Sequence, residues 1–245
     1  MTKLLVVEHE ADAGLGLLGE RFAEIGVETV IVGPDAGRPV PDSLDGYDGL
    51  IVLGGAMGPT DDGVAPWLPA TRELLARAVE ESVPTLGICL GAQLLATATG
   101  GHVRRIPGAP EVGLLSVELT EAAASDPLLG GFDHPELPVV QWHWLEADRL
   151  PDGAELLASS PACRNQAFRL GENAWGLQFH PEALGATAQA WTSVEDITED
   201  GLDPETVVGE VRRAEPELRG AWQTLADRFA SVAQDRGARA RLLRA

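Results

Sequence analysis

The chain has 245 residues, and 38 acidic residues against 18 basic ones give it a formal charge of −20. A surface this acidic repels phosphate backbones and anionic lipids, which argues against nucleic acid and membrane surfaces as partners. Two cysteines exclude a disulfide scaffold, and no apolar run reaches the length of a membrane helix. The sequence opens without a secretion signal, so we expect a cytoplasmic protein.

Short apolar runs and helical periodicities alternate through the first hundred residues. The apolar runs predict buried strands, and apolar positions spaced three or four residues apart predict helices that cover them. Strands are expected at 4–8, 27–32, 50–53 and 83–88, and helices at 12–25, 69–81 and 92–99. This alternation is typical of an α/β fold of the flavodoxin-like kind, with a mostly parallel central sheet covered by helices.

The alternation ends near residue 100. Apolar runs at 112–119, 165–170 and 174–179 follow one another without helices between them. Gly171-Glu172-Asn173 is a natural hairpin turn between the last two runs. These features predict a small antiparallel sheet.

Helical patterns fill the rest of the chain. They are expected at 183–193, 204–213 and 217–234. No stretch with the composition of a linker divides the sequence. We therefore predict one domain over residues 1–245, with a core of about 3–183 and a C-terminal helical extension of about 184–245.

The segment Gly87-Ile88-Cys89-Leu90-Gly91 joins a predicted strand to a predicted helix. It has the pattern of a nucleophile elbow, a tight turn that projects a reactive side chain from the carboxyl end of a sheet. Side chains beside the cysteine would clash, which explains the glycines. The helix N-terminus favours a thiolate and offers N–H groups to an oxyanion. Alone, the pattern also fits a buried cysteine at a closely packed strand–helix junction.

A second candidate segment is Gly176-Leu177-Gln178-Phe179-His180-Pro181-Glu182. His180 ends an apolar strand, so it should also project from the end of a sheet. Glu182 lies beyond a proline that stiffens the turn, and its carboxylate can fix the tautomer of an imidazole that acts as a general base. In isolation, the segment also fits a surface loop with a solvated histidine and glutamate.

Together, the two segments resemble the nucleophile and His/Glu segments of the class I glutamine amidotransferases, whose triad is Cys-His-Glu. Leu53-Gly54-Gly55-Ala56-Met57 is similar to the oxyanion-strand loop of that family, and 158–168 resembles the strands that precede its histidine. The resemblance extends over about residues 3–183 and is closest to the stand-alone GMP synthase-like members.

The resemblance implies a reaction and a role for each residue. Cys89 would attack the γ-carboxamide of glutamine, His180 would carry the thiol proton to the departing ammonia, and Glu182 would orient His180. The backbone N–H groups of Gly55 and Leu90 would hold the oxyanion. Water would then hydrolyse the γ-glutamyl thioester to glutamate.

The resemblance also suggests a substrate pocket. Its expected residues are Gln93, Gly54, Gln141, Trp142 and His143. Gln93 lies one helical turn after the cysteine, where the family binds glutamine. His143 is a rival base, but no stiffly placed carboxylate accompanies it, so we favour His180. The tryptophans at 142 and 144 also fit a purely structural role. Gln141-Trp142-His143-Trp144 departs from the Ser-His-Gly-Asp of GMP synthases proper, which argues against that specific enzyme.

We expect neither a metal nor a cofactor. Asp61-Asp62 has no further ligands at metal-binding spacing, and the sequence lacks the G-K-[ST] of a phosphate-binding loop. Cys163 has no nearby base in the sequence, so we interpret it as an inert thiol.

The expected substrate is glutamine or another γ-glutamyl compound. The residues beyond 183 are too few and too helical for an ATP-using synthetase, so the protein either has a separate synthetase subunit as partner or works alone. One alternative is a stand-alone γ-glutamyl peptide or amide hydrolase with the same thioester chemistry. A second alternative is a non-catalytic regulatory module of the same fold, although the intact Cys89, His180 and Glu182 argue against it.

Overall fold

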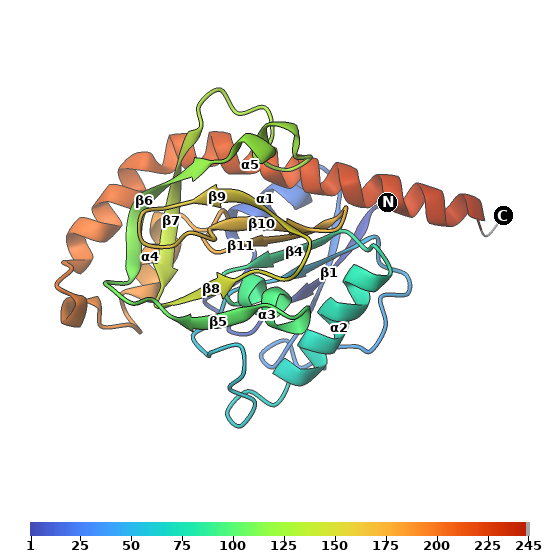
Figure 1. Ribbon diagram of the computed structural model, residues 1–245, viewed down its shortest axis with the longest axis horizontal. Coiled ribbons are helices and arrows are strands. Elements are labelled where there is room, and N and C mark those ends of the chain that lie inside the picture. Colours follow the sequence, from blue (N-terminus) through green and yellow to red (C-terminus); the bar gives the residue numbers. More distant parts are fainter. Residues whose placement is uncertain (244–245) are drawn as a thin grey trace.

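The computed structural model describes residues 1–243, with side chains described through residue 238. Within this range the chain forms a nine-stranded sheet, in the order β2-β1-β3-β4-β11-β10-β9-β6-β7, and a two-stranded sheet of β5 and β8 (Figure 1). The strands are β1 (Lys3–Val7), β2 (Glu28–Val32), β3 (Gly49–Val52), β4 (Thr85–Ile88), β5 (His102–Arg105), β6 (Glu111–Leu119), β7 (Glu136–His143), β8 (Leu145–Arg149), β9 (Ala154–Ser159), β10 (Ala167–Leu170) and β11 (Ala174–Leu177). The helices are α1 (Gly16–Glu24), α2 (Leu68–Glu80), α3 (Leu90–Ala98), α4 (Gly185–Trp191) and α5 (Pro204–Leu243), with short 3₁₀ helices η1 (Glu121–Ser125) and η2 (Ile197–Asp200).

The large sheet combines a parallel and an antiparallel half. Strands β2, β1, β3, β4 and β11 are parallel, and β10, β9, β6 and β7 continue the sheet in antiparallel fashion. The predicted hairpin around Gly171 is β10–β11, and it belongs to this large sheet. The small antiparallel sheet consists instead of β5 and β8, which the sequence patterns did not indicate.

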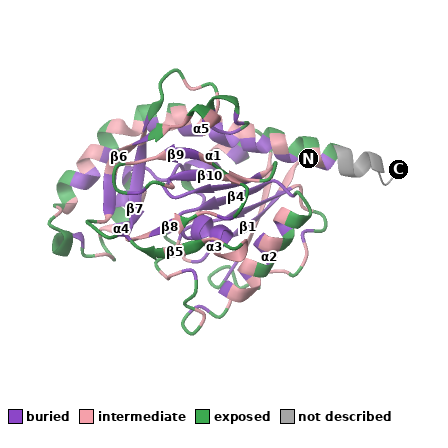
Figure 2. Ribbon diagram, viewed as in Figure 1, coloured by how far each residue is buried: buried purple, intermediate pink, exposed green. Residues whose placement is uncertain are grey.

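Helices cover both faces of the large sheet because its parallel strands are apolar on both sides. In β1, Leu4 and Val6 face the core shared with α1 and α5, whereas Leu5 and Val7 face the core shared with α2 and α3. All four side chains are fully buried. Figure 2 shows most strands of the large sheet and α3 as buried, whereas α2 and α5 carry exposed residues.

The parallel pairing of β11 with β4 brings the two candidate segments together. Leu177 lies opposite Ile88, so the residues after both strands emerge at the same edge of the sheet. β11 ends at Leu177, two residues earlier than predicted. The N–H of His180 then donates to the carbonyl of Val140 in β7, at 2.9 Å. This register places His180 beside Cys89.

Strands β5, β7, β8 and β9 were not predicted. In β5 and β8 the charged residues mask the alternation of a half-buried strand. β5 is largely exposed. Its Arg104 pairs with the buried Glu146 of β8 at 3.0 Å. Such a pairing satisfies both charges across the strands, and no pattern within one strand reveals it.

The two helices predicted at 204–213 and 217–234 are a single helix, α5, so that prediction was wrong. The gap between the two predicted helices contains Pro216, which cannot donate an intrahelical hydrogen bond. The helix instead continues through this proline and changes direction along its length (Figure 1). Buried residues on both sides of the proline, including Val211 and Trp222, hold it on the sheet. Residues 244–245 of the expected extension lie outside the described residues.

Although α5 has 40 residues, neither it nor another helix in the described range is apolar enough to cross a membrane.

Candidate active site

Cys89 occupies the turn between β4 and α3 and has a φ of 50°, in the strained left-handed region. A β-carbon on Gly87 would lie 2.5 Å from the carbonyl oxygen of Gly91, and one on Gly91 would overlap the carbonyl of Val52. The predicted reason for the two glycines is therefore confirmed. The sulfur stands at the N-terminus of α3, where the helix dipole favours a thiolate.

His180 and Glu182 form a buried pair beside this turn. Nδ1 of His180 lies 2.6 Å from Oε1 of Glu182, and the residues are 3% and 2% exposed. Burial alone would lower the pKa of His180, but the charges of Glu182 and of the Cys89 sulfur, with their hydrogen bonds, raise it to about 10. The arrangement favours the imidazolium form of His180.

The backbone of Glu182 is held by the start of α1. Its carbonyl accepts the N–H of Leu17 at 2.9 Å. Gly16, with a φ of 45°, packs so closely against the same carbonyl that a β-carbon would overlap it. A turn far away in the sequence therefore fixes the position of the carboxylate.

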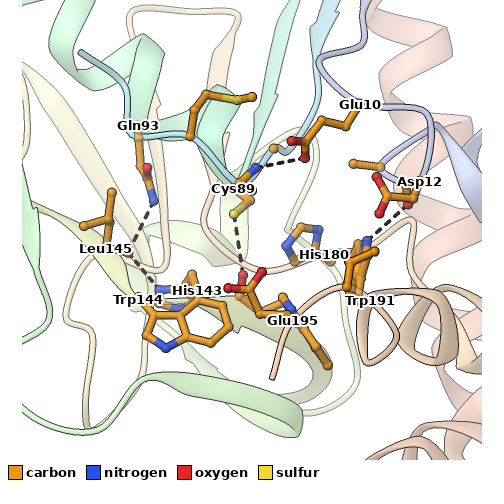
Figure 3. A pocket seen from close by; sticks show the side chains of 16 residues that line it. Glu10, Asp12, Cys89, Gln93, His143, Trp144, Leu145, His180, Trp191 and Glu195 are labelled. Carbon is orange, nitrogen blue, oxygen red and sulfur yellow. Dashed lines mark hydrogen bonds between the residues drawn. The ribbon is translucent and has the colours of Figure 1, made fainter. Parts of the chain in front are cut away.

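A cavity of about 130 Å³ opens over Cys89, and Figure 3 shows the side chains around it. Its lining contains Cys89 and His180, the oxyanion-loop residues Gly55 and Ala56, and a wall formed by 142–145. Carboxylates from Glu10, Asp12 and Glu195 and the ring of Trp191 complete it. The cavity gathers segments that are widely separated along the chain.

The predicted oxyanion loop faces the elbow. A β-carbon on Gly54 would lie 3.2 Å from Cε1 of His180 and 3.6 Å from Cβ of Cys89, so this glycine lets the two side chains approach. Gly55 lines the cavity, and the side chain of Leu90 packs against it. The loop thus lies within reach of a group bound at the sulfur.

The predicted pocket residues divide into two groups. Gln93, Trp142 and His143 line the cavity, and the carbonyl of Trp142 lies 3.9 Å from Sγ of Cys89. Gly54 and Gln141 do not line the cavity, and Gln141 is fully buried in β7. Only the first group is therefore placed to touch a ligand there.

Both ring nitrogens of His143 face groups other than the cysteine. Nδ1 lies 2.9 Å from the carbonyl oxygen of Leu145, and Nε2 lies 3.2 Å from Oε2 of Glu111. Glu111 is itself buried and accepts the hydroxyl of Ser160 at 2.7 Å. This network makes His143 part of the pocket wall.

Three polar residues at the site had no predicted role. Gln178, within the His/Glu segment, donates to Sγ of Cys89 at 3.6 Å. Glu10 accepts the N–H of Ala56 at 2.9 Å. It lies just after β1, at the edge of the sheet that carries Cys89, and this position in the sequence could have indicated a residue of the site. Burial raises the pKa of Glu10, the Ala56 hydrogen bond opposes this rise, and the charges of nearby carboxylates that include Glu195 add to it. Glu195 lies in the C-terminal extension and carries no local signal.

The remaining candidates have structural partners. Burial, with the charges of Glu111 and Glu146, raises the pKa of the Cys163 thiol, as expected of an inert cysteine. Asp61 accepts the N–H of Gly58 at 2.7 Å, and Asp62 pairs with Arg72 at 2.8 Å. In the described part of the chain, no cluster of three His, Cys, Asp or Glu side chains is arranged to hold a metal ion.

A second cavity of about 940 Å³ adjoins the first between β5 and η2. The two cavities share four lining residues: Ala56, Trp144, Leu145 and Glu195. The space over Cys89 therefore continues into a wide groove.

The family model for class I glutamine amidotransferases matches residues 12–192, well over half of the chain. The chain belongs to this family. Its fold agrees with that assignment: a solved glutamine amidotransferase of Thermotoga maritima superposes with a TM-score of 0.84 and 28% identity, covering 94% of this chain and 98% of that protein. A glutamine amidotransferase of Methylobacillus flagellatus also gives 0.84, with 26% identity over 95% of each chain.

Sequence relatives of this amidotransferase fall into more than one functional group. The glutamine-hydrolysing GMP synthase subunit of Natronomonas pharaonis is 34% identical over 77% of this chain and 92% of its own length. The glutamine amidotransferase-like protein YfeJ of Salmonella typhimurium is 36% identical, and γ-glutamyl peptidase 3 of Arabidopsis thaliana is 33% identical. Each of these two matches covers 60% of this chain, but only 62% and 59% of the relatives themselves.

Proposed function

We propose that this amidotransferase hydrolyses the γ-carboxamide of glutamine through a γ-glutamyl thioester on Cys89 and releases ammonia for a separate synthetase or another acceptor. One observation carries the proposal: the elbow sulfur shares a cavity with His180, whose Nδ1 is held 2.6 Å from Glu182. In this proposal Cys89 is the nucleophile, His180 is the general base and Glu182 is the carboxylate that orients the base, which is the set of groups that acyl transfer requires.

In the proposed reaction the Cys89 thiolate attacks the amide carbon, and the N–H groups of Gly55 and Leu90 stabilise the oxyanion. The His180 imidazolium gives its proton to the leaving nitrogen, and ammonia departs as the thioester forms. Neutral His180 then takes a proton from water, which attacks the thioester and releases glutamate and the cysteine. Glu182 keeps the imidazole oriented in both steps.

Relatives among the GMP synthase subunits support a separate synthetase as the ammonia acceptor, because their name describes one part of a larger glutamine-hydrolysing enzyme. The two-subunit arrangement is part of the proposal for this chain.

A second candidate function is the hydrolysis of γ-glutamyl peptides or amides. The wide groove that continues from the cavity over Cys89 favours it, since a leaving group larger than ammonia needs space beyond the scissile bond. A γ-glutamyl peptidase among the relatives supports the same chemistry.

The test is glutamate release by the purified protein from L-glutamine and from γ-glutamyl dipeptides, with Cys89→Ala as the blank. Faster turnover of glutamine supports the first proposal, and faster turnover of the dipeptides supports the second. Undiminished turnover by Cys89→Ala contradicts both. Absence of turnover, together with failure of a glutamine-like chloroketone to label Cys89, would favour the non-catalytic alternative.

A further inference from the structure

We infer that Gln178 is a further catalytic residue, whose side-chain amide donates to the Cys89 sulfur and stabilises its thiolate, and that Gln93 holds this amide in place. The inference rests on the proposed function, in which Cys89 is the nucleophile. It gives Gln93 a positioning role in addition to the substrate contact that the resemblance implied.

Gln178 reaches the sulfur from the segment between β11 and His180. Its backbone N–H donates to the carbonyl of Gln166 at 2.8 Å, which ties the residue to the neighbouring chain segment. Its side chain is buried, with the residue 2% exposed, and Nε2 lies 3.6 Å from Sγ of Cys89. Because buried polar groups are almost always hydrogen-bonded, we interpret the contact of this buried amide with the thiol as a hydrogen bond.

The neighbours determine which end of the Gln178 amide faces the sulfur. The carbonyl of Leu145 can only accept, so the Gln93 group that faces it at 3.3 Å is the amino group. The same amino group lies 3.1 Å from Gln178, which must therefore present its oxygen. The amino group of Gln178 is left to face Cys89. The orientation thus follows from a chain of contacts that begins at a backbone carbonyl.

This donor matters most after the thiol has lost its proton. The carbonyl of Trp142, 3.9 Å from Sγ, can accept a hydrogen bond from the thiol but offers nothing to a thiolate. The Gln178 amide can donate to the thiolate, and hydrogen bonds to an ionised partner are the stronger kind. Because the amide is neutral, it adds no charge that would compete with His180 for the proton. It favours the ion pair that precedes attack.

Gln93 has used both of its amide hydrogens within the protein, on Leu145 and on Gln178. Removing its side chain would leave the Gln178 amide free to rotate. A Gln93 variant should therefore slow the alkylation of Cys89 as a weaker Gln178 variant would, an effect that loss of a substrate contact alone would not produce.

The experiment measures the rate of alkylation of Cys89 by iodoacetamide against pH, with the label located by peptide mass spectrometry. Iodoacetamide reports thiolate formation without using the glutamine pocket. For Gln178→Leu we expect alkylation about tenfold slower at pH 7, with the midpoint of the profile about one pH unit higher. Gln178→Glu keeps the shape but replaces the donor, and should be slower still. Gln93→Leu should move the midpoint in the same direction by less. Gln189→Leu, at an exposed position of α4, is the control.

The outcomes separate the inference from the proposed function. If wild-type Cys89 reacts no faster at pH 7 than cysteine in a short peptide, the nucleophile itself is wrong. If the wild type is reactive and both Gln178 variants, folded by circular dichroism, keep its profile, the role of Gln178 is wrong. If Gln93→Leu leaves alkylation unchanged while Gln178→Leu slows it, the positioning role of Gln93 is wrong.

Discussion

Gly16 packs against the backbone carbonyl of Glu182 so closely that no larger residue fits between α1 and the His/Glu segment. We predict that Gly16→Ala displaces Glu182 and lowers turnover by about tenfold to a hundredfold, because small shifts in catalytic geometry are costly. The free energy of unfolding should fall by about 2–4 kcal/mol from strain and overlap. Steady-state kinetics and urea unfolding measure the two effects.

Gly26 provides the matched control for this substitution. It also has a positive φ, 75°, but a β-carbon there would meet nothing within 4 Å. Gly26→Ala should therefore cost about 1 kcal/mol of stability and leave turnover unchanged. Equal losses of activity in the two variants would mean that general strain, and not contact with Glu182, causes the effect.

Glu182→Gln tests the orienting carboxylate while preserving shape. The amide can present an N–H to Nδ1 of His180, which favours the wrong tautomer, so we expect turnover to fall by about 10²- to 10⁴-fold. Thermal unfolding checks that the variant is folded. Glu136→Gln, on an exposed part of β7, is the control. Full activity in Glu182→Gln would exclude this carboxylate from the reaction.

His143 and His180 should respond differently to removal. Nδ1 and Nε2 of His143 face Leu145 and Glu111, so its ring is not free to take the proton of Cys89. We predict that His180→Ala lowers kcat by at least about a hundredfold, whereas His143→Gln acts mainly on KM. A loss of kcat in His143→Gln as large as that in His180→Ala would make His143 the base.

His9 should make the fold less stable in mild acid. It is buried, its Nδ1 accepts the indole N–H of Trp67 at 2.9 Å, and burial lowers its pKa from 6.5 to about 4. Because the unfolded chain binds this proton more readily, the free energy of unfolding should decrease as pH falls from 6.5 to 4. The loss through His9 is on the order of 3 kcal/mol.

The test of this prediction is urea unfolding between pH 7 and 4. His9→Gln keeps a hydrogen-bond acceptor for Trp67 but has no proton to gain, so its pH dependence should be shallower than that of the wild type. Parallel curves for the two proteins would show that carboxylates alone cause the acid sensitivity.

The sequence alone was enough to predict features that depend on residues close together in the chain. The apolar runs around Leu5, Leu50 and Leu86 predicted buried strands, and the spacing of Gly87 and Gly91 indicated the tight turn at Cys89. The sequence alone predicts the elbow because the close contacts that require its glycines lie within one strand–helix junction. The pairing of His180 with Glu182 is also local, since only a proline separates them.

Pairing between distant segments decided the rest. Only the parallel pairing of β11 with β4 places His180 beside Cys89, and only the folded chain brings Leu17 to the carbonyl of Glu182. Continuity of α5 through Pro216 likewise follows from burial against the sheet, which outweighs the local preference for a break. Local sequence limits which conformations each segment can adopt, but hydrogen bonds and burial between segments far apart in the chain select the arrangement that forms the site.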